Sequence, residues 1–273
     1  MTTPTSTPAV VSRSSGLASA TWSAARAVAW RHLYKWISMP SNFLPTFLFP
    51  LVFFASFAGG LTAIRNVPGF HYEPGYTSFI FVFSLLQTCL FGGLATGFTI
   101  AADFESGFAR RLMLCTQSRM AILLGYMLST FARALAMCVV VTLVAFVVGL
   151  KMLGSIPEIL ALYAMALAMS FIGTLWASGV MFRGRSAQVA PAMQMPMFIA
   201  LFLAPVYLPI ELLDGWIHAI ASINPVTYVM EAGRSLLAGT HEHVRVAVAC
   251  IAAMAVVLGL WAVTGVRSAE RAG

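Results

Sequence analysis

The chain has 273 residues, of which 60% are hydrophobic and 9% charged, and its 16 lysines and arginines outnumber its 9 acids. An ordinary globular domain carries about a quarter charged residues, so these few charges cannot cover the surface of a water-soluble protein. The composition excludes a soluble enzyme, a disordered chain and a nucleic-acid-binding domain, although the net charge is +7. The apolar residues form long runs near the ~20 residues that cross a hydrocarbon core, which predicts a polytopic helical membrane protein.

Two segments precede the first apolar run. Residues 1–20 are rich in Ser, Thr and Pro, which predicts a disordered cytoplasmic tail. Residues 21–38 place an apolar face opposite Arg31 and Lys35 at helical spacing, so we expect an amphipathic helix in the headgroup plane. That face consists of Trp22, Ala29, Trp30, Leu33, Trp36 and Ile37. The helix is either a membrane anchor or a mechanical element, and its pattern favours neither.

Six apolar runs follow and predict six transmembrane helices, which together form one transmembrane domain over residues 43–266. Each run holds at most one or two ionisable residues, as expected of helices whose backbone polar groups are satisfied internally. The predicted spans are 43–64, 76–101, 120–150, 157–182, 188–210 and 244–266. They make the chain an all-α polytopic membrane protein.

Basic residues indicate how the chain is oriented. With a cytoplasmic N-terminus, 11 of the 16 basic residues fall on the inner side, 4 on the outer side, and Arg133 within the third span. Because cytoplasmic loops carry the excess of Lys and Arg, we expect both termini, including the short tail 267–273, to lie in the cytoplasm. The positive charge then reflects membrane topology, and no nucleic-acid partner is expected.

The residue clusters that catalysis or metal binding needs are missing from the sequence. The four cysteines form no CxxC pair, and His241 and His243 have no further ligands at a suitable spacing, so we expect no metal site. The nine acids are scattered, which leaves no candidate catalytic residue. Neither lysine follows a glycine, so the chain has no P-loop, and any ATP hydrolysis must take place on another polypeptide.

The densest charge cluster lies between the second and third spans, in residues 103–119. On a helix, Phe108 and Leu112 share one side, while Arg110 and Arg111 point elsewhere. Such a piece can dock in the groove of a partner protein, with its arginines paired to acids there. A loop whose arginines merely fix the orientation of the chain explains the pattern equally well.

This segment has the pattern acid-x-Glu-x-Gly-Phe-x-x-Arg-Leu, followed by Ser-Arg and Leu-x-Gly. Its residues are Asp103, Glu105, Gly107, Phe108, Arg111, Leu112, Ser118, Arg119, Leu123 or Leu124, and Gly125. A second segment, before the last span, contains Pro209, Trp216, Asn224, Pro225, Tyr228, Glu231, Arg234, Leu236, Leu237 and Gly239. Both segments resemble the ABC-2 exporter permeases, the transmembrane subunits of type-2 ABC transporters, and most of all the bacterial daunorubicin and drug-resistance exporters.

The resemblance implies partners for this chain. Two ATPase subunits, which bind ATP and Mg²⁺, would sit on the cytoplasmic face, and this chain would hold no cofactor itself. A second permease copy, as a homodimer or a heterodimer, would complete the transporter. Residues 103–119 would couple to the ATPase, braced by the amphipathic N-terminal helix. The coupling residues implied are Asp103, Glu105, Gly107, Phe108, Arg110, Arg111, Leu112 and Arg119.

Substrate would pass between the two permease copies, along the second and fifth spans. The candidate lining residues are Phe91, Phe98, Met193, Met195 and Met197. Aromatic and methionine side chains tolerate varied ligands, but ordinary packing between helices also uses them. Arg133 lies ~13 residues into its span and therefore faces protein or water rather than lipid. We also expect it to help set the inward-facing state.

The external segment 211–243 is too apolar for a free loop. It predicts a re-entrant helical segment that stops at Asn224-Pro225. We expect this segment to act as an outer gate, with the residues Trp216, Asn224, Pro225 and Tyr228.

Together with these features, the resemblance implies an ATP-driven permease of the bacterial plasma (inner) membrane, surrounded by membrane lipids, that exports a hydrophobic drug or a lipid-like substrate. A permease that exports a polysaccharide or a lipid-linked glycan shares this architecture and is an alternative. An integral membrane enzyme is a third interpretation, which the missing acid cluster disfavours.

Overall fold

The computed structural model describes residues 13–38, 40–60, 71–115 and 120–271, and it places them in helices and connecting loops. Ten α-helices and two short 3-10 helices follow one another along these residues. The α-helices are α1 (Arg13–Ser38), α2 (Pro40–Gly60), α3 (Tyr76–Glu105), α4 (Phe108–Cys115), α5 (Met120–Val148), α6 (Ile156–Gly184), α7 (Ala190–Phe202), α8 (Gly215–Ile223), α9 (Pro225–Ala238) and α10 (Val244–Arg271). The 3-10 helices are η2 (Ala187–Val189) and η3 (Ile210–Leu212).

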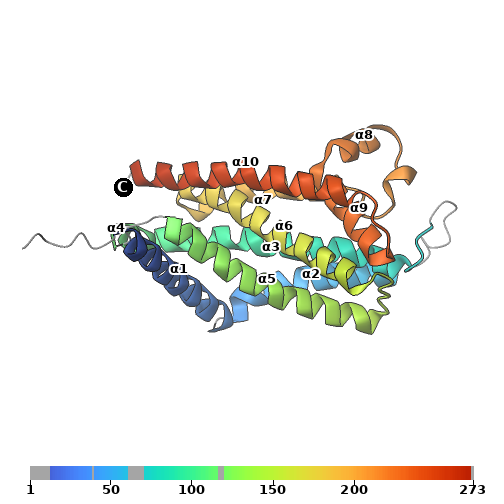
Figure 1. Ribbon diagram of the computed structural model, residues 1–273, viewed down its shortest axis with the longest axis horizontal. Coiled ribbons are helices and arrows are strands. Elements are labelled where there is room, and N and C mark those ends of the chain that lie inside the picture. The colour runs from blue at the N-terminus through green and yellow to red at the C-terminus, as the bar shows by residue number, and fades with distance from the viewer. Residues whose placement is uncertain (1–12, 39, 61–70, 116–119, 272–273) are drawn as a thin grey trace, which may run out of the picture.

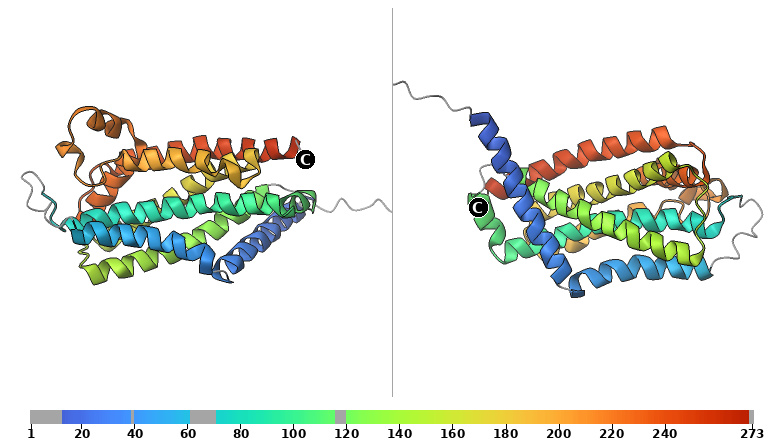
Figure 2. Two further views of the ribbon diagram at one scale, coloured as in Figure 1. Left: turned by 180° about the vertical axis from the view of Figure 1, so that it is seen from behind. Right: turned by 60° about the horizontal axis from the view of Figure 1, so that its bottom comes forward.

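The long helices lie side by side in an elongated bundle (Figure 1). α3 is its central element, because every residue from Ser78 to Leu90 is buried and the helix packs against α2, α5 and α6. α10 packs on α6, and α1 crosses α5 obliquely (Figure 2). The apolar core therefore forms around α3.

The two ends of the bundle carry different elements. α4, the beginning of α1 and the end of α10 lie at one end, which we call the α4 end (Figure 1). α8 and α9 lie at the other end, which we call the α8 end (Figure 1). The length of the long helices thus separates the charged segment around α4 from the segment before the last helix.

Four helices in the described part of the chain are long and apolar enough to cross a membrane: α3, α5, α6 and Val244–Ala269 of α10. Shorter apolar helices, Leu48–Gly60 and Ala187–Phe202, lie at the positions of the first and fifth predicted spans. Residues 61–64, the end of the first predicted span, lie outside the described residues.

The fifth predicted span, 188–210, is longer than the helix found there. α7 ends at Phe202 after 13 residues, roughly 20 Å at 1.5 Å per residue, against a hydrocarbon core of about 30 Å. Pro205 and Pro209 follow, and neither can donate the backbone hydrogen bond that a continuing helix needs.

Two further boundaries differ from the prediction. α1 begins at Arg13, so residues 13–20 belong to a helix rather than to a tail, whereas residues 1–12 lie outside the described residues. The reason is that no proline follows Pro8 in this region and that leucine and alanine, which favour helices, fill much of positions 17–20. α10 likewise continues to Arg271, because no glycine or proline interrupts its last turn.

Small residues let α3 and α6 approach closely. A methyl group added to Gly93 would overlap the Ser170 carbonyl oxygen, and one added to Gly173 would overlap the Leu90 carbonyl oxygen. The neighbouring Gly92 has open space at the same position, with no atom within 4 Å. The contact lies within one subunit, and it depends on the two glycines at the crossing.

The substitution Gly93→Ala is therefore expected to destabilise the bundle by about 1–3 kcal/mol, because the added methyl group forces α3 and α6 apart. The matched substitution Gly92→Ala is expected to preserve or raise stability, since alanine favours a helix over glycine. Thermal unfolding in detergent, followed by helical circular dichroism, compares the two variants. Equal unfolding midpoints for both would contradict the close contact at Gly93.

Candidate functional site

Asp103 lies in the last turns of α3, and only 1% of its side chain is exposed. Its Oδ1 accepts a hydrogen bond from Arg31 at 2.8 Å, and its Oδ2 accepts one from the Tyr126 hydroxyl at 2.8 Å. His32 Nε2 lies 3.3 Å from Oδ2, and Lys35 Nζ lies 3.9 Å from Oδ1. We call these five side chains the Asp103 cluster. Because they come from α1, α3 and α5, the carboxylate joins three helices near the α4 end.

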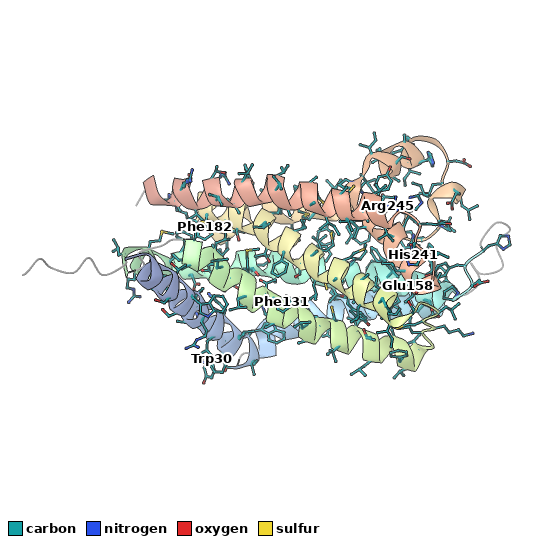
Figure 3. All side chains as sticks on the ribbon, in the orientation of Figure 1. Trp30, Phe131, Glu158, Phe182, His241 and Arg245 are labelled. Atoms are coloured by element: carbon teal, nitrogen blue, oxygen red, sulfur yellow. The ribbon has the colours of Figure 1, made fainter. Side chains whose placement is uncertain are left out.

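α1 reaches Asp103 with Arg31 and Lys35, the two basic residues that the sequence places opposite the apolar face of this helix. The buried carboxylate offers them a charge partner. The inward stripe consists of Val28, Arg31, His32 and Lys35, at the 3–4 spacing of one helix face. Trp30, in contrast, is 70% exposed and points away from the bundle (Figure 3). The signals available in the sequence were the four-residue spacing of Arg31 and Lys35 and, separately, the acid at the end of the second predicted span.

A tight turn at Gly107 joins α3 to α4. Its φ is +71°, a backbone conformation that glycine adopts far more readily than other residues. The Phe108 ring follows directly, and the Arg31 guanidinium lies over it, 3.5 Å from the ring centroid. On α4, Leu112 packs toward the core, whereas Arg111 is exposed. α1 thus contacts α4 as well as α3, and α4 keeps a cation available at the surface.

Glu105 connects this region to the segment between α6 and α7. Its Oε1 accepts a hydrogen bond from the Ala187 backbone N–H at 2.9 Å and another from the Ser186 hydroxyl at 3.5 Å. Two of the predicted coupling residues cannot be placed, because the side chain of Arg110 and the whole of Arg119 lie outside the described residues.

His32 contributes no charge to the Asp103 cluster at neutral pH. Burial lowers the pKa of His32 from 6.5 to about 4, although the adjacent Asp103 carboxylate favours the charged form. The nearby cations Arg31, Arg133 and Lys35 lower this pKa further. The Asp103 carboxylate is therefore balanced by the arginine and lysine of α1, and not by the histidine.

Lowering the pH is expected to release α1 from the Asp103 cluster. In undocked α1, a solvated His32 takes up a proton near pH 6.5, whereas the docked imidazole stays neutral down to about pH 4. Docking is therefore strongest above pH 6.5 and loses up to about 3 kcal/mol as the pH falls from 6.5 to 4. Protease accessibility of α1 between pH 8 and pH 4 measures the release. An unchanged pH profile in His32→Phe would show that another group controls it.

A cavity of about 760 Å³ adjoins the Asp103 cluster. Residues of α1, α2, α3, α5 and α7 bound it, so side chains far apart in the sequence share one space. The lining residues that matter for its chemistry are Lys35, Phe91, Phe98, Asp103, Arg133 and Phe198. The volume falls within the range of about 300–1,000 Å³ that is usual for sites of small molecules.

Arg133 of α5 brings a guanidinium to this cavity and is 8% exposed. Its Nη2 donates to the Thr96 hydroxyl at 2.7 Å and to the Thr130 hydroxyl at 3.2 Å. Its Nε donates to the Ser129 carbonyl oxygen at 3.4 Å. Arg133 therefore faces the interior of the bundle, as the position of a charge within an apolar run predicts.

The family profile described as ABC-2 type transporter matches residues 23–238, from α1 to the end of α9. The chain belongs to the ABC-2 type transporter family. It is similar to the daunorubicin resistance ABC transporter permease protein DrrB1 of Streptomyces coeruleorubidus, with 24% identity over 219 residues, which are 77% of this chain and 74% of the relative. No solved structure matches it.

The ABC-2 permease is a membrane protein that serves transport and is not itself an enzyme. Permeases of this family work with an ABC ATPase and as permease dimers. The resemblance seen in the sequence is thereby confirmed.

In this ABC-2 permease, the residues predicted to line a translocation path separate into two groups. Those that line the cavity are Phe91, Phe98 and Arg133. The methionines of α7 do not belong to its lining: Met193 is buried, Met197 is half-buried, and Met195 is 62% exposed. α7 instead contributes Gln194 and Phe198. Gln194 and Phe198 are four residues apart and share one helix face, whereas Met195 is two residues from both Met193 and Met197 and cannot share a face with them.

The α8 end of the permease holds the predicted gate residues. The Asn224 side-chain oxygen caps the first turn of α9, and its amide group donates to the Ala200 carbonyl oxygen of α7. Pro225 begins α9, and the Tyr228 hydroxyl donates to a carbonyl oxygen of α8 at 2.7 Å. These three residues form the corner between α8 and α9. Trp216 lies on α8, and 69% of it is exposed.

Proposed function

We propose that the chain is the transmembrane subunit of an ATP-driven exporter in the bacterial plasma membrane, which moves a hydrophobic drug or lipid-like substrate out of the cytoplasm or the inner leaflet. Two permease copies, identical or different, assemble with two ATPase subunits at the α4 end. α2 and α7 complete a set of six spans, and both termini are cytoplasmic. The name of the relative, which refers to daunorubicin resistance, supports a drug-like cargo.

The Asp103 cluster is the observation that carries this proposal. Its carboxylate joins α1 to the end of α3, directly before the turn that leads into α4, and Arg111 of α4 is exposed. Tyr126 extends the connection to α5, which lines the cavity through Arg133. A displacement of α4 by the ATPase therefore reaches the cavity through contacts between packed helices. ATP binding drives the change because the ATPase favours one arrangement of these helices over another.

The cavity supports a hydrophobic cargo over a polysaccharide. Aromatic rings from α2, α3 and α7 line it, with the centroids of Phe91 and Phe198 4.6 Å apart. Apolar rings with a few polar groups are typical of sites for drug-sized molecules. At the α8 end, the corner of α8 and α9 at Asn224 forms the outer gate.

Reconstitution with a partner ABC ATPase tests the proposal. Proteoliposomes loaded with ATP on the ATPase side are supplied with hydrophobic dyes of positive, zero and negative charge. We expect ATP-dependent movement of at least one dye, and none with an ATPase whose P-loop lysine is replaced. A permease that moves no dye and retains no ATPase through purification would overturn the proposal.

A further inference from the structure

Arg133 carries a buried charge that no described acid neutralises. Its hydrogen bonds go to the hydroxyls of Thr96 and Thr130 and to the carbonyl oxygen of Ser129, and all three acceptors are uncharged. Among the described residues, no carboxylate oxygen lies within 4.0 Å of its guanidinium. A buried cation without a counter-charge is unfavourable, and charges within spans mark functional sites.

Asp103, the acid that lines the cavity, does not serve as the counter-charge of Arg133. Asp103 is bound by Arg31 at 2.8 Å and has Lys35 at 3.9 Å, so α1 alone supplies two cations to it. His32 is uncharged at neutral pH because burial lowers its pKa to about 4. The lining groups therefore carry one negative charge on Asp103 and two positive charges, on Lys35 and Arg133. The cavity holds an excess of positive charge.

The cavity is elongated and differs in chemistry along its length. Phe91 and Asp103 line it from the same helix and are 12 residues apart, roughly 18 Å at 1.5 Å per residue. Near Phe91 the walls are aromatic: its ring lies 4.6 Å from that of Phe198 and 6.4 Å from that of Phe49. Toward Asp103 the walls carry the charges. Phe49 and Phe98 are 44% and 41% exposed, so the space is open along these rings.

We propose that this cavity binds amphiphiles that carry a negative charge, with the anionic group on the Arg133 guanidinium and the apolar body against the rings of Phe91 and Phe198, which contact each other and line the cavity. A carboxylate or a phosphate accepts the strong, charge-assisted hydrogen bonds that the guanidinium offers, and it neutralises the excess charge. The inference rests on the proposed function, because it names the substrate class of the export path.

Binding of two matched probes to the complex of permease and ATPase in nanodiscs tests the inference. Pyrenebutyrate and pyrenebutanol share one aromatic body and differ in the negative charge. Quenching of tryptophan fluorescence reports binding, since Trp36 lines the cavity. In phosphatidylcholine nanodiscs the wild-type complex is expected to bind pyrenebutyrate at least about tenfold more tightly than pyrenebutanol. Equal affinities for the two probes would overturn the inference without any variant.

Substitutions at Arg133 test whether its guanidinium causes the preference for pyrenebutyrate over pyrenebutanol. Arg133→Gln is expected to bring the affinity ratio of the two probes to about one, whereas Arg133→Lys keeps most of it because the charge remains. Arg245→Gln removes an exposed arginine at the α8 end and serves as the control that leaves the ratio unchanged. Copurification with the ATPase verifies that each variant is assembled. If Arg133→Gln assembles with the ATPase and keeps the wild-type affinity ratio of the two probes, Arg133 does not bind the anionic group.

The lipid composition of the nanodisc distinguishes two sources of the anionic group, a lipid headgroup and a free amphiphile. If phosphatidylglycerol in the nanodisc weakens pyrenebutyrate binding to the wild type by about tenfold or more, and not to Arg133→Gln, the site takes a lipid headgroup. If it does not, the site takes a free amphiphile. If the complex prefers the anionic probe but moves no dye with ATP, the proposed export function is wrong and the anion-binding site remains. If the complex moves dyes with ATP but shows no preference for the anionic dye, this inference alone is wrong.

Discussion

Replacing Asp103 with asparagine is expected to reduce ATP-driven export by more than about tenfold. The side chain is buried and accepts charge-assisted hydrogen bonds, and hydrogen bonds to a charged group contribute about 1.5–3 kcal/mol each. Without the negative charge, Arg31 and Lys35 repel one another and α1 loses its attachment to α3. Initial export rates in proteoliposomes, at equal amounts of permease and ATPase, measure the effect.

Removing a negative charge at an exposed position is the control for the loss of the Asp103 charge. Asp214 is exposed at the start of α8 and its side chain makes no capping hydrogen bond, so Asp214→Asn is expected to leave export unchanged. The double variant Arg31→Gln with Asp103→Asn should lose little more than Asp103→Asn alone, because both remove one interaction. Additive losses in the double variant would mean that the two side chains act independently.

Replacing Arg234 with methionine is expected to destabilise the α8 end severely. Arg234 of α9 is 2% exposed; its Nη1 donates to Glu231 at 2.7 Å and its Nη2 to the Val206 carbonyl oxygen at 3.1 Å. Its guanidinium also lies 3.5 Å from the ring centroid of Phe79 at the start of α3. Removing one partner of a buried ion pair costs about 3–5 kcal/mol, because the other charge is left uncompensated. The expected fall in the thermal midpoint is roughly 10 °C.

A second substitution tests this explanation. Adding Glu231→Gln to Arg234→Met is expected to recover much of the lost stability, since no unpaired charge remains. Arg245→Gln, at an exposed position of α10, is the control for the loss of one arginine. If the double variant melts no higher than Arg234→Met, contacts of the arginine with α3 and with Val206 determine the stability instead of the ion pair.

Much of the helical architecture could be predicted from composition and periodicity, because apolar runs of span length have few alternatives to a helix. α3, α5, α6 and α10 follow predicted spans closely. α7 does not, since Pro205 and Pro209 end a helix within a run that hydropathy alone treats as continuous.

The candidate site was predictable only in part. Asp103 and Arg133 stand out in the sequence, as an acid at the end of a span and as a charge within one. Their surroundings could not be predicted, because Arg31 reaches Asp103 across 72 residues of chain and no local pattern encodes that contact. The cavity depends on how five helices pack, and the sequence specifies helix faces but not which faces meet.

The Asp103 cluster also constrains the order in which the protein matures during synthesis. α1 leaves the ribosome first, but its partners Asp103 and Tyr126 belong to α3 and α5, which are translated later. Arg31 and Lys35 of α1 therefore remain solvated until α5 has entered the membrane, and α1 docks as a late step. Until then, the exposed Trp22 and Trp30 anchor α1 at the membrane surface.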